Sequence, residues 1–436
     1  MTTQRRGATE SRNLIFPANQ ETMSSYFIPQ STPEINAIAH SEIAFVLRLG
    51  RALHQYGYPA DRLEAVMERA AQQFELEGQF FTTPTSIFAA FGALEEQRTF
   101  LMRVEPGESN LGKLAALDEV TNQVLRGKIS PARGAQRIDE ILAAPSPYGW
   151  PLTIAAFGLA SAAASRFLGG GEREALVAGL LGLMIGVLAF LTSKWQALGR
   201  VFELAAAFAV STCATIIATQ FGSRSVANDI LAGLIVLMPG LTLTNAMTEL
   251  STRHLVAGTA RLSAAFVIFL ELGFGVAVGG ILIRSWLGEP VLLTLIPMPA
   301  WTLWLALLIA PLAFTILLRA QPRDALWIVL AGILAFIGSQ FGAGWLGPEL
   351  GVFIGALTVS IASNFYSRLK DRPSTITLVP GILLLVPGSV GFRSLAALMD
   401  KEVIPGIETA FKMILIAIAL AAGILVGKNV APPRGI

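Results

Sequence analysis

The sequence is poor in the residues that form disulfides, metal sites and nucleotide sites. Its only cysteine, Cys213, lies inside an apolar run, which excludes a disulfide framework or a cysteine-based metal site. The three histidines lack the HExxH and HxH spacings, which argues against a zinc site. No GxxxxGK[ST] phosphate loop occurs, so nothing supports ATP-driven chemistry by this chain. We therefore expect no cofactor, metal or nucleic-acid partner, and we assign no catalytic residue.

Charged residues are also scarce. They make up 14% of the 436 residues, against roughly 25% in a soluble domain. Their distribution is uneven, because 31 lie in the first 150 residues and 31 in the remaining 286. This pattern excludes a wholly soluble enzyme and a disordered chain. It predicts a polytopic α-helical membrane protein preceded by a small soluble α+β domain.

The N-terminal part has the signals of a water-soluble domain. Residues 1–38 are polar and lack the apolar core of a signal peptide, so we interpret them as a flexible cytoplasmic tail. Residues 39–149 show helical spacing twice, then strand-like segments at 79–91 and 99–105, then helical spacing twice more. Asn110 is placed to cap the third helix. We expect a cytoplasmic α+β domain ending in a proline-rich hinge.

Ten apolar stretches follow, each near the roughly 20 residues that a helix needs to cross a hydrocarbon core. They are approximately 150–167, 175–193, 201–221, 226–247, 262–283, 301–318, 325–341, 350–365, 375–392 and 410–427. Eleven basic residues fall in the loops on one side and six on the other, which places both termini in the cytoplasm. We expect a multi-pass protein of the cell (inner) membrane.

The ten stretches form two similar sets of five. GLIVLMPG at 233–240 in the fourth stretch matches GILLLVPG at 381–388 in the ninth. Because five is odd, a duplicated second copy is inverted, as in many secondary transporters. We therefore predict two inverted five-helix repeats, with the first at 150–283, a connecting loop at 284–300 and the second at 301–436.

The paired Pro-Gly dipeptides have two interpretations. One is a tolerated kink, because proline and glycine are common in membrane helices. Their recurrence at matching positions instead favours broken helices whose backbone groups bind substrate. The predicted substrate and pore residues are Pro239, Gly240, Asn245, Pro387, Gly388 and Arg393. Asn245 would orient a polar ligand, while Arg393 would either pair with a carboxylate or mark the outer interface.

Glu271 is the predicted proton-coupling residue. It lies ten residues after Arg261 and thirteen before Arg284, far from both charged ends of its helix. A carboxylate there is costly unless it is neutral, paired or in contact with water, and burial would favour its protonated form. The alternative is a structural hydrogen bond to a neighbouring helix. Three GxxxG pairs predict helix packing, with homo-oligomer formation as the alternative: Gly182/Gly186, Gly275/Gly279 and Gly351/Gly355.

Together these pieces resemble the threonine/serine exporter family over about residues 43–426. The matching motifs are LGRALHQYGYPADRLEAVMERAA, FTTPTSI, NLGKLAALDEVTNQVLRGKIS and the paired MPG and VPG segments. The resemblance implies export of small hydroxy amino acids driven by the proton motive force. It also implies relatives, some divided into two chains, that are linked to dicarboxylate export.

The family's RxE and TPT patterns fall in the soluble domain at Arg62, Glu64, Thr83, Pro84 and Thr85. They fit either a helix ion pair and a turn at a strand end, or a substrate-sensing or hydrolytic pocket. Hydrolysis needs a nucleophile with a base, and no spacing here assembles a Ser/His/Asp set.

Three functions therefore remain open. The first is a secondary exporter of threonine and serine, or of dicarboxylates such as succinate, with protons as the coupling ion. The second is a membrane-bound hydrolase acting through the soluble domain, and the third is a passive channel or scaffold. The duplicated halves and Glu271 favour the exporter, so we interpret the chain as a transporter and not an enzyme.

Overall fold

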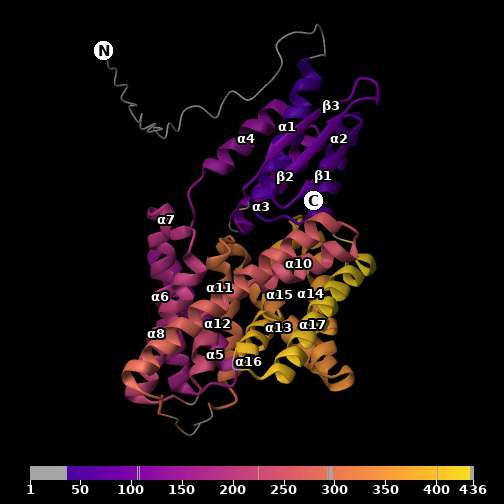
Figure 1. Ribbon diagram of the computed structural model, residues 1–436. Helices are drawn as coiled ribbons and strands as arrows, with labels where there is room; N and C mark the ends of the chain where they lie inside the picture. The colour runs from indigo at the N-terminus through magenta and orange to yellow at the C-terminus, as the bar shows by residue number, and fades with distance from the viewer. Residues whose placement is uncertain are drawn as a thin grey trace, which may run out of the picture. The chain divides into compact units, whose positions relative to one another are not determined.

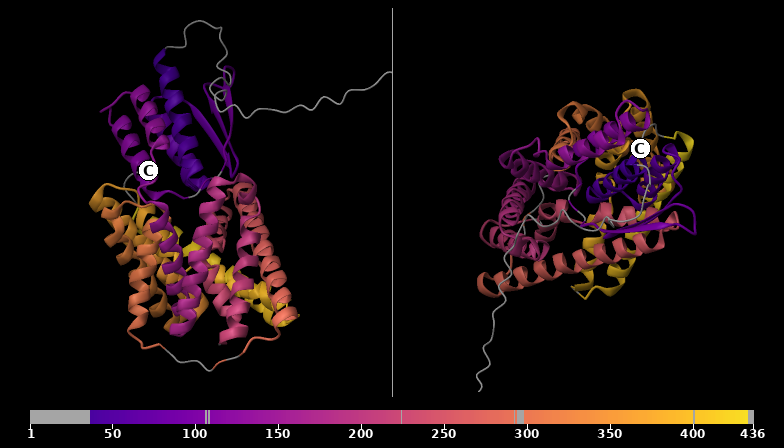
Figure 2. Two further views of the ribbon diagram at one scale, coloured as in Figure 1. Left: turned by 90° about the vertical axis from the view of Figure 1, so that its left-hand side faces the viewer. Right: turned by 90° about the horizontal axis from the view of Figure 1, so that it is seen from above.

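The computed structural model describes residues 37–432, except for Pro106, Glu108, Arg224, Leu292, residues 294–297 and Asp400. Most of the predicted tail at 1–38 therefore lies outside the described residues, as does part of the predicted loop at 284–300. The chain divides into a unit of residues 1–40 and a unit of residues 41–436. Of the first unit, only the opening turn of α1 is described. The account below concerns the second unit, shown in Figures 1 and 2.

The α+β region contains four helices and three strands. They are α1 (Ala37–Gln55), α2 (Ala60–Gln73), β1 (Gly78–Thr83), β2 (Ser86–Phe91), β3 (Arg98–Arg103), α3 (Leu111–Leu125) and α4 (Pro131–Ala143). The predicted cap is confirmed, since the Asn110 side chain accepts a hydrogen bond from the Lys113 backbone N–H at 2.9 Å. Such a cap satisfies an amide that has no partner within the helix.

The predicted strand at 79–91 is wrong as a single strand. It is a hairpin, with β1 paired antiparallel to β2 and a turn at Pro84 and Thr85. Proline cannot donate a hydrogen bond to a neighbouring strand, so the TPT segment interrupts the pairing. β3 pairs antiparallel with β2, which gives the sheet order β1-β2-β3.

The apolar core of the α+β region continues into the membrane helices. Phe45, Leu63 and Leu117 are fully buried in it, and Ala320 and Tyr366 from the membrane part belong to the same cluster. The backbone joins as well, because the N–H groups of Leu111 and Gly112 donate to the carbonyls of Leu318 and Arg319. This contact fixes the start of α3 against the chain that follows the sixth predicted span.

All ten predicted spans coincide with helices or with helices broken in the middle. Their elements are α5 (Trp150–Phe167), α6 (Glu172–Lys194), α7 (Gln196–Gly199), α8 (Phe202–Phe221), α9 (Val226–Gly233), η1 (Ile235–Leu237), α10 (Gly240–Ser251), α11 (Leu255–Leu287), α12 (Thr302–Leu317), η2 (Pro322–Asp324), α13 (Ala325–Leu346), α14 (Pro348–Lys370), α15 (Thr375–Leu383), α16 (Gly388–Met399) and α17 (Val403–Val430).

By length and composition, seven segments of the described residues are able to cross a membrane. The bent pair formed by α9 and α10 makes an eighth when it is counted as one span. α12 is apolar but only 16 residues long, and α5 is not among the seven. The chain is therefore a polytopic helical membrane protein, and the count of ten spans stays a prediction.

Corresponding helices of the two sets of five contact corresponding neighbours. α6 packs on α5 and on α9, and in the same way α13 packs on α12 and on α15. α8 packs along α11, as α14 packs along α17, and the second half of each broken helix packs on the last helix of its set. The two sets meet through α5 with α12, α10 with α17 and α11 with α16.

The GxxxG pairs serve packing inside the chain. A Cβ atom on Gly186 would lie 2.8 Å from Ile154 Cα on α5, and one on Gly275 would lie 2.6 Å from the Leu204 carbonyl on α8. A Cβ atom on Gly355 would lie 2.7 Å from the Ala335 carbonyl on α13. Such distances leave no space for a side chain, so glycine lets these backbones approach closely.

Large apolar side chains cover the outside of the membrane helices. Among them Trp286, Trp301 and Trp345 are between 64% and 80% exposed, and all three lie at helix ends away from the α+β region. Tryptophan at helix ends is typical of a membrane interface. α11, with 33 residues, is about 50 Å long at 1.5 Å per residue. It runs obliquely past its neighbours, as Figure 2 shows.

Candidate substrate site between two broken helices

Two membrane segments break at the Pro-Gly pairs. In the first, η1 ends at Leu237 and α10 begins at Gly240, and a bend of 55° lies just upstream, between α9 and the stretch Ile235–Ser251. In the second, α15 ends at Leu383 and α16 begins at Gly388. Proline has no backbone N–H and clashes with the preceding turn, so it starts a new helix more readily than it continues one. The breaks therefore follow from the sequence.

The two breaks touch each other. A Cβ atom on Gly240 would overlap the Val386 side chain and lie 3.1 Å from the Gly388 backbone nitrogen. A Cβ atom on Gly388 would lie 2.9 Å from Met238 Cβ. The N-terminal ends of α10 and α16 thus meet, and each carries the partial positive charge of a helix N-terminus.

A cavity of about 70 Å³ lies between the α+β region and the membrane helices, and we call it the domain-side cavity. Its lining includes Tyr58, Asp61 and Arg62 from the α+β region and Leu241, Thr244, Asn245, Thr248, Thr375, Leu378, Ile382 and Lys428 from the membrane helices. A space of this size holds several water molecules or a small polar solute.

A wider cavity, of about 460 Å³, lies at the opposite ends of the helices, and we call it the far-side cavity. It is lined by Arg166 and Phe167 at the end of α5 and by Leu384, Val386, Pro387 and Ser389 at the second break. Leu241 lines the domain-side cavity and Val386 the far-side cavity, while Gly240, next to Leu241, contacts Val386. The contact between the breaks therefore separates the two cavities.

Asp61 and Lys428 form an ion pair in the domain-side cavity. Lys428 Nζ lies 3.1 Å from Asp61 Oδ2, and the two side chains are only 21% and 13% exposed, respectively. Burial alone would raise the pKa of Asp61, but the Lys428 ammonium and the Arg62 guanidinium outweigh it and hold that pKa below its usual value. Asp61 is therefore a carboxylate at neutral pH.

Two buried polar atoms in the same lining have no hydrogen-bond partner among the described residues. They are Asp61 Oδ1 and Thr375 Oγ1. A buried polar atom without a partner costs about 1 to 3 kcal/mol, and most such atoms in proteins are paired with protein, water or ligand. Both residues line the cavity, so a ligand or water inside it is the available partner.

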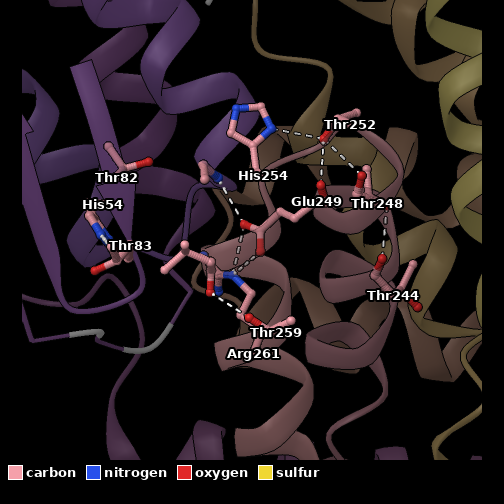
Figure 3. Close-up of polar contacts among 12 residues, drawn as sticks. His54, Thr82, Thr83, Thr244, Thr248, Glu249, Thr252, His254, Thr259 and Arg261 are labelled. Carbon is pink, nitrogen blue, oxygen red and sulfur yellow. Dashed lines mark hydrogen bonds and ion pairs between the residues drawn. The ribbon is translucent and has the colours of Figure 1, made fainter. Parts of the chain in front are cut away.

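The cavity-facing side of α10 carries a row of threonines, shown in Figure 3. The hydroxyl of Thr244 donates to the Gly240 carbonyl at 3.0 Å, and that of Thr248 donates to the Thr244 carbonyl at 2.9 Å. Thr252 continues the pattern to the Thr248 carbonyl. Because each hydroxyl proton is used within the helix, the lone pairs of Thr244 and Thr248 remain available as acceptors in the cavity lining.

Glu249 joins α10 and α11 to the α+β region. It is fully buried, and both of its oxygens accept hydrogen bonds from Arg261 Nε at 3.0 Å. Its Oε1 also accepts from the backbone N–H of Ala60, the first residue of α2, at 3.0 Å. The carboxylate thus accepts a hydrogen bond from an amide that has no partner within α2 (Figure 3). Its negative charge also interacts favourably with the partial positive charge at the N-terminus of that helix.

Glu64 forms a second link. Its Oε1 accepts from the backbone N–H and the hydroxyl of Thr82 at 2.7 and 2.8 Å, and its Oε2 lies 3.2 Å from His254 Nε2. The carboxylate stands between the hydroxyl and the histidine, whereas a Ser/His/Asp set places the histidine in the middle. His54 Nε2 contacts the Thr83 carbonyl at 2.6 Å, which holds the start of the TPT turn.

The other predicted site residues are distributed over several places. Asn245 and Arg62 line the domain-side cavity, and Pro387 lines the far-side cavity. Thr85 lies in the hairpin turn, where its carbonyl accepts from the Val104 backbone N–H, and Pro84 lies beside it. Arg393 is exposed on α16 and lines neither cavity.

Glu271 is half-buried on α11 and lines neither cavity. It shares a helix stripe with Val267, Phe274 and Val278, which are 51%, 62% and 40% exposed. Among the described residues its carboxylate has no hydrogen-bond or ion-pair partner. The structure thus places Glu271 at the edge of the apolar outer surface.

Sequence reasoning missed several charged residues. Lys428 is one of the eleven basic residues that predict the topology, and Asp61 lies at the start of α2, so neither position by itself indicates a site. Glu249 and Asp229 lie in or beside an apolar stretch, and both are buried. Ser223 donates to Asp229 Oδ2 at 2.5 Å, while Asp229 Oδ1 has no partner among the described residues. An acidic residue inside an apolar stretch is a signal that could have found Asp229.

No group of three or more His, Cys, Asp or Glu side chains placed to hold a metal ion occurs in the described part of the chain. Among the described residues, the polar side chains that line the two cavities are those of tyrosine, serine, threonine, asparagine, glutamine, arginine, lysine and a single aspartate. These groups suit hydrogen bonding and charge pairing with a small polar solute.

Comparison with models of known protein families assigns the chain to a family. A family model for threonine/serine exporters matches residues 44–282, and a second model described as threonine/serine exporter matches residues 303–430. The chain belongs to the threonine/serine exporter family. This exporter-family chain therefore carries the family's features both in the α+β region and in the membrane helices.

Relatives of this exporter-family chain include proteins named pheromone-regulated membrane protein 10. The one from Candida albicans (strain WO-1) is 29% identical over 380 residues, which cover 84% of this chain and 34% of the relative. Those from Eremothecium gossypii and Saccharomyces cerevisiae (strain YJM789) are each 26% identical over 80% of this chain and over 48% and 46% of their own lengths. The match thus spans a third to a half of these curated relatives. No solved structure matches the chain.

Proposed function

We propose that this protein is a secondary active exporter that moves threonine and serine out of the cytoplasm. The observation that carries the proposal is the pair of cavities on either side of the contact between Gly240 and Val386. A substrate that enters the domain-side cavity passes outward only when the two broken helices separate. Alternating access of this kind is typical of transporters with broken helices near the membrane centre.

The breaks also provide chemistry for an amino acid. The N-terminal ends of α10 and α16 meet there, and their partial positive charges favour a substrate carboxylate. Asn245 lies in the domain-side cavity on the first turns of α10, where its amide is able to orient the substrate. Pro239 and Pro387 keep the two helix starts in place by ending the preceding segments.

The matching helix contacts of the two halves support inverted repeats. Corresponding helices of the two halves have corresponding neighbours. The halves meet where α5 contacts α12, α10 contacts α17 and α11 contacts α16. An inverted pair of repeats allows one conformation open to each side of the membrane with similar energies. We place both termini and the α+β region in the cytoplasm of the cell (inner) membrane.

We propose that protons drive the export and that Glu271 binds them. Its carboxylate has no partner among the described residues, so neither protonation state breaks an existing contact. Asp229 is the competing candidate, because it is fully inside the protein and keeps one oxygen unpaired within the described part. Transport by variants of each residue separates these two assignments.

Transport into inverted vesicles or out of reconstituted liposomes tests the function. Labelled threonine, serine and succinate are compared with and without a proton gradient. We expect gradient-driven movement of threonine and serine from the cytoplasmic face. Gradient-driven movement of succinate, without movement of either amino acid, would show that the substrate is a dicarboxylate. Movement that only follows the substrate's own concentration gradient would show that the protein is a channel and not an exporter.

The orientation has its own test. Cysteines introduced at Lys194, Lys370 and Lys428 in a Cys213→Ala background should react only with membrane-permeant reagents in intact cells. Labelling of these positions by an impermeant reagent from outside would reverse the proposed topology.

A further inference from the structure

We propose that the α+β region supplies part of the substrate site, and that the domain-side cavity binds a zwitterionic hydroxy amino acid between Asp61 and the cations Lys428 and Arg62. This inference rests on the proposed export of small amino acids and adds where, and by which groups, the substrate is first bound. The three charges come from opposite sides of the cavity. Asp61 and Arg62 belong to α2, and Lys428 belongs to α17.

The charges match those of an amino acid. Asp61 keeps Oδ2 on Lys428 at 3.1 Å, while its buried Oδ1 has no partner among the described residues. An ammonium group in the cavity gives that oxygen the hydrogen bond it lacks. Lys428 has three donors, of which the contact with Asp61 uses one, so it remains able to hold a carboxylate together with Arg62.

The acidic group discriminates among substrates of different charge. A dicarboxylate would place a second carboxylate in a small, poorly solvated cavity that already holds the Asp61 carboxylate. Like charges a few ångströms apart are unfavourable there, whereas an ammonium is attracted. The site should therefore prefer a zwitterion to succinate.

Thr375 supplies a preference for a hydroxyl side chain. Its buried hydroxyl lines the cavity and has no hydrogen-bond partner among the described residues. Thr244 and Thr248 add acceptor lone pairs on the α10 side. A site that pairs its own polar group with a substrate hydroxyl rejects an analogue without that hydroxyl.

The test is calorimetric titration of the full-length protein in detergent, with threonine, threonine methyl ester, N-acetylthreonine, 2-aminobutyrate and succinate. We expect threonine to bind at least 10-fold more tightly than each of the other four. The ester lacks the carboxylate charge, the acetyl derivative lacks the ammonium, and 2-aminobutyrate lacks the hydroxyl.

Variants locate the site. Asp61→Asn should weaken threonine binding at least 10-fold, and Asp61→Glu should restore part of it because the charge returns. Thr375→Val should reduce the preference for threonine over 2-aminobutyrate while leaving 2-aminobutyrate binding unchanged. The matched control is Asp139→Asn, which removes a carboxylate from an exposed ion pair with Arg48 on the same α+β region. Thermal melts of each variant show whether it is folded.

The outcomes separate this inference from the proposed function. Suppose that the parent protein exports threonine in liposomes but that folded Asp61→Asn binds threonine as the parent does. This result would overturn the proposed site at Asp61, Lys428 and Arg62, while the proposed export function would remain supported. Equal or tighter binding of succinate than of threonine would also overturn it. Absence of threonine binding and of threonine transport in the parent protein would overturn both proposals.

Discussion

The two broken helices have nearly the same sequence at the break but differ in their surroundings. GLIVLMPG leads into α10, whose threonines and Asn245 line the domain-side cavity and whose Glu249 binds Arg261 and α2. GILLLVPG leads into α16, whose Ser389 lines the far-side cavity and whose Arg393 is exposed.

The difference shows that the same Pro-Gly motif makes both breaks, while different contacts give each break its chemistry. Both breaks need proline to end one helix and glycine to permit the close approach. The first is joined to the α+β region by a hydrogen bond from the N-terminus of α2 to Glu249, whose carboxylate a buried ion pair with Arg261 holds in place, whereas the second contacts that region through apolar packing of α15, with Ile376 in the shared core. We therefore expect the α+β region to control the first broken helix more than the second.

The largest expected effect comes from removing the link on α10. Glu249→Ala leaves the largely buried Arg261 and the backbone N–H of Ala60 without the carboxylate that both contact. Breaking such a pair costs about 3 kcal/mol. We expect a clear fall in melting temperature in detergent. Arg393→Ala on α16 is the control and should melt like the parent, so equal losses in the two variants would contradict the asymmetry.

The contact between the breaks is the next test. Gly240→Ala and Gly388→Ala each place a Cβ atom within the contact, at 3.1 Å from Gly388 nitrogen and 2.9 Å from Met238 Cβ. Because displacement of a site by about 1 Å costs about 100-fold in rate, we expect losses of that order in threonine transport by liposomes. Gly344→Ala, which faces open space on α13, should transport normally. Parent-like transport by both variants would show that the two breaks do not form the barrier.

A smaller and more selective effect is expected for the proton-binding residue. Glu271→Gln keeps the side-chain shape but removes titration, so liposomes should lose accumulation against a gradient while still exchanging labelled for unlabelled threonine. Asp229→Asn is measured alongside. If the glutamine variant accumulates threonine like the parent and the asparagine variant does not, the coupling residue lies in the first broken helix and not in α11.

The smallest effect concerns the α+β wall of the cavity. Burial raises the pKa of Tyr58 to about 12, although the Arg62 guanidinium beside it acts in the opposite direction. A raised pKa means that the folded state favours the neutral phenol, so this stabilisation is complete below pH 10 and is lost as the pH rises toward 12.

Tyr58→Phe should therefore reduce the loss of stability between pH 10 and 12, by about 1 kcal/mol at pH 11. Melting temperatures across this range check the effect, with absorbance at 295 nm following phenol ionisation. An unchanged pH dependence in the variant would show that Tyr58 is not the group responsible.

Much of the fold could be predicted because it depends on local patterns. Asn110 caps α3 as its position before an apolar run predicted, and all ten apolar stretches are helical. The strand at 79–91 was wrong because its composition favoured one long strand, whereas Pro84 starts a turn. Long apolar spans are easier to recognise than short strands, since their signal extends over about 20 residues.

The sequence by itself determined the apolar helical segments, the two breaks and the higher charge density of the first part, because hydrophobicity and the missing proline N–H act within a few residues. The tertiary structure alone decided which charges face each other. Asp61 and Lys428 are 367 positions apart in the sequence. No local sequence pattern relates residues at that separation. Their pairing depends on how the α+β region lies against the membrane helices, and a buried ion pair is stable only when that packing brings the two charges into contact.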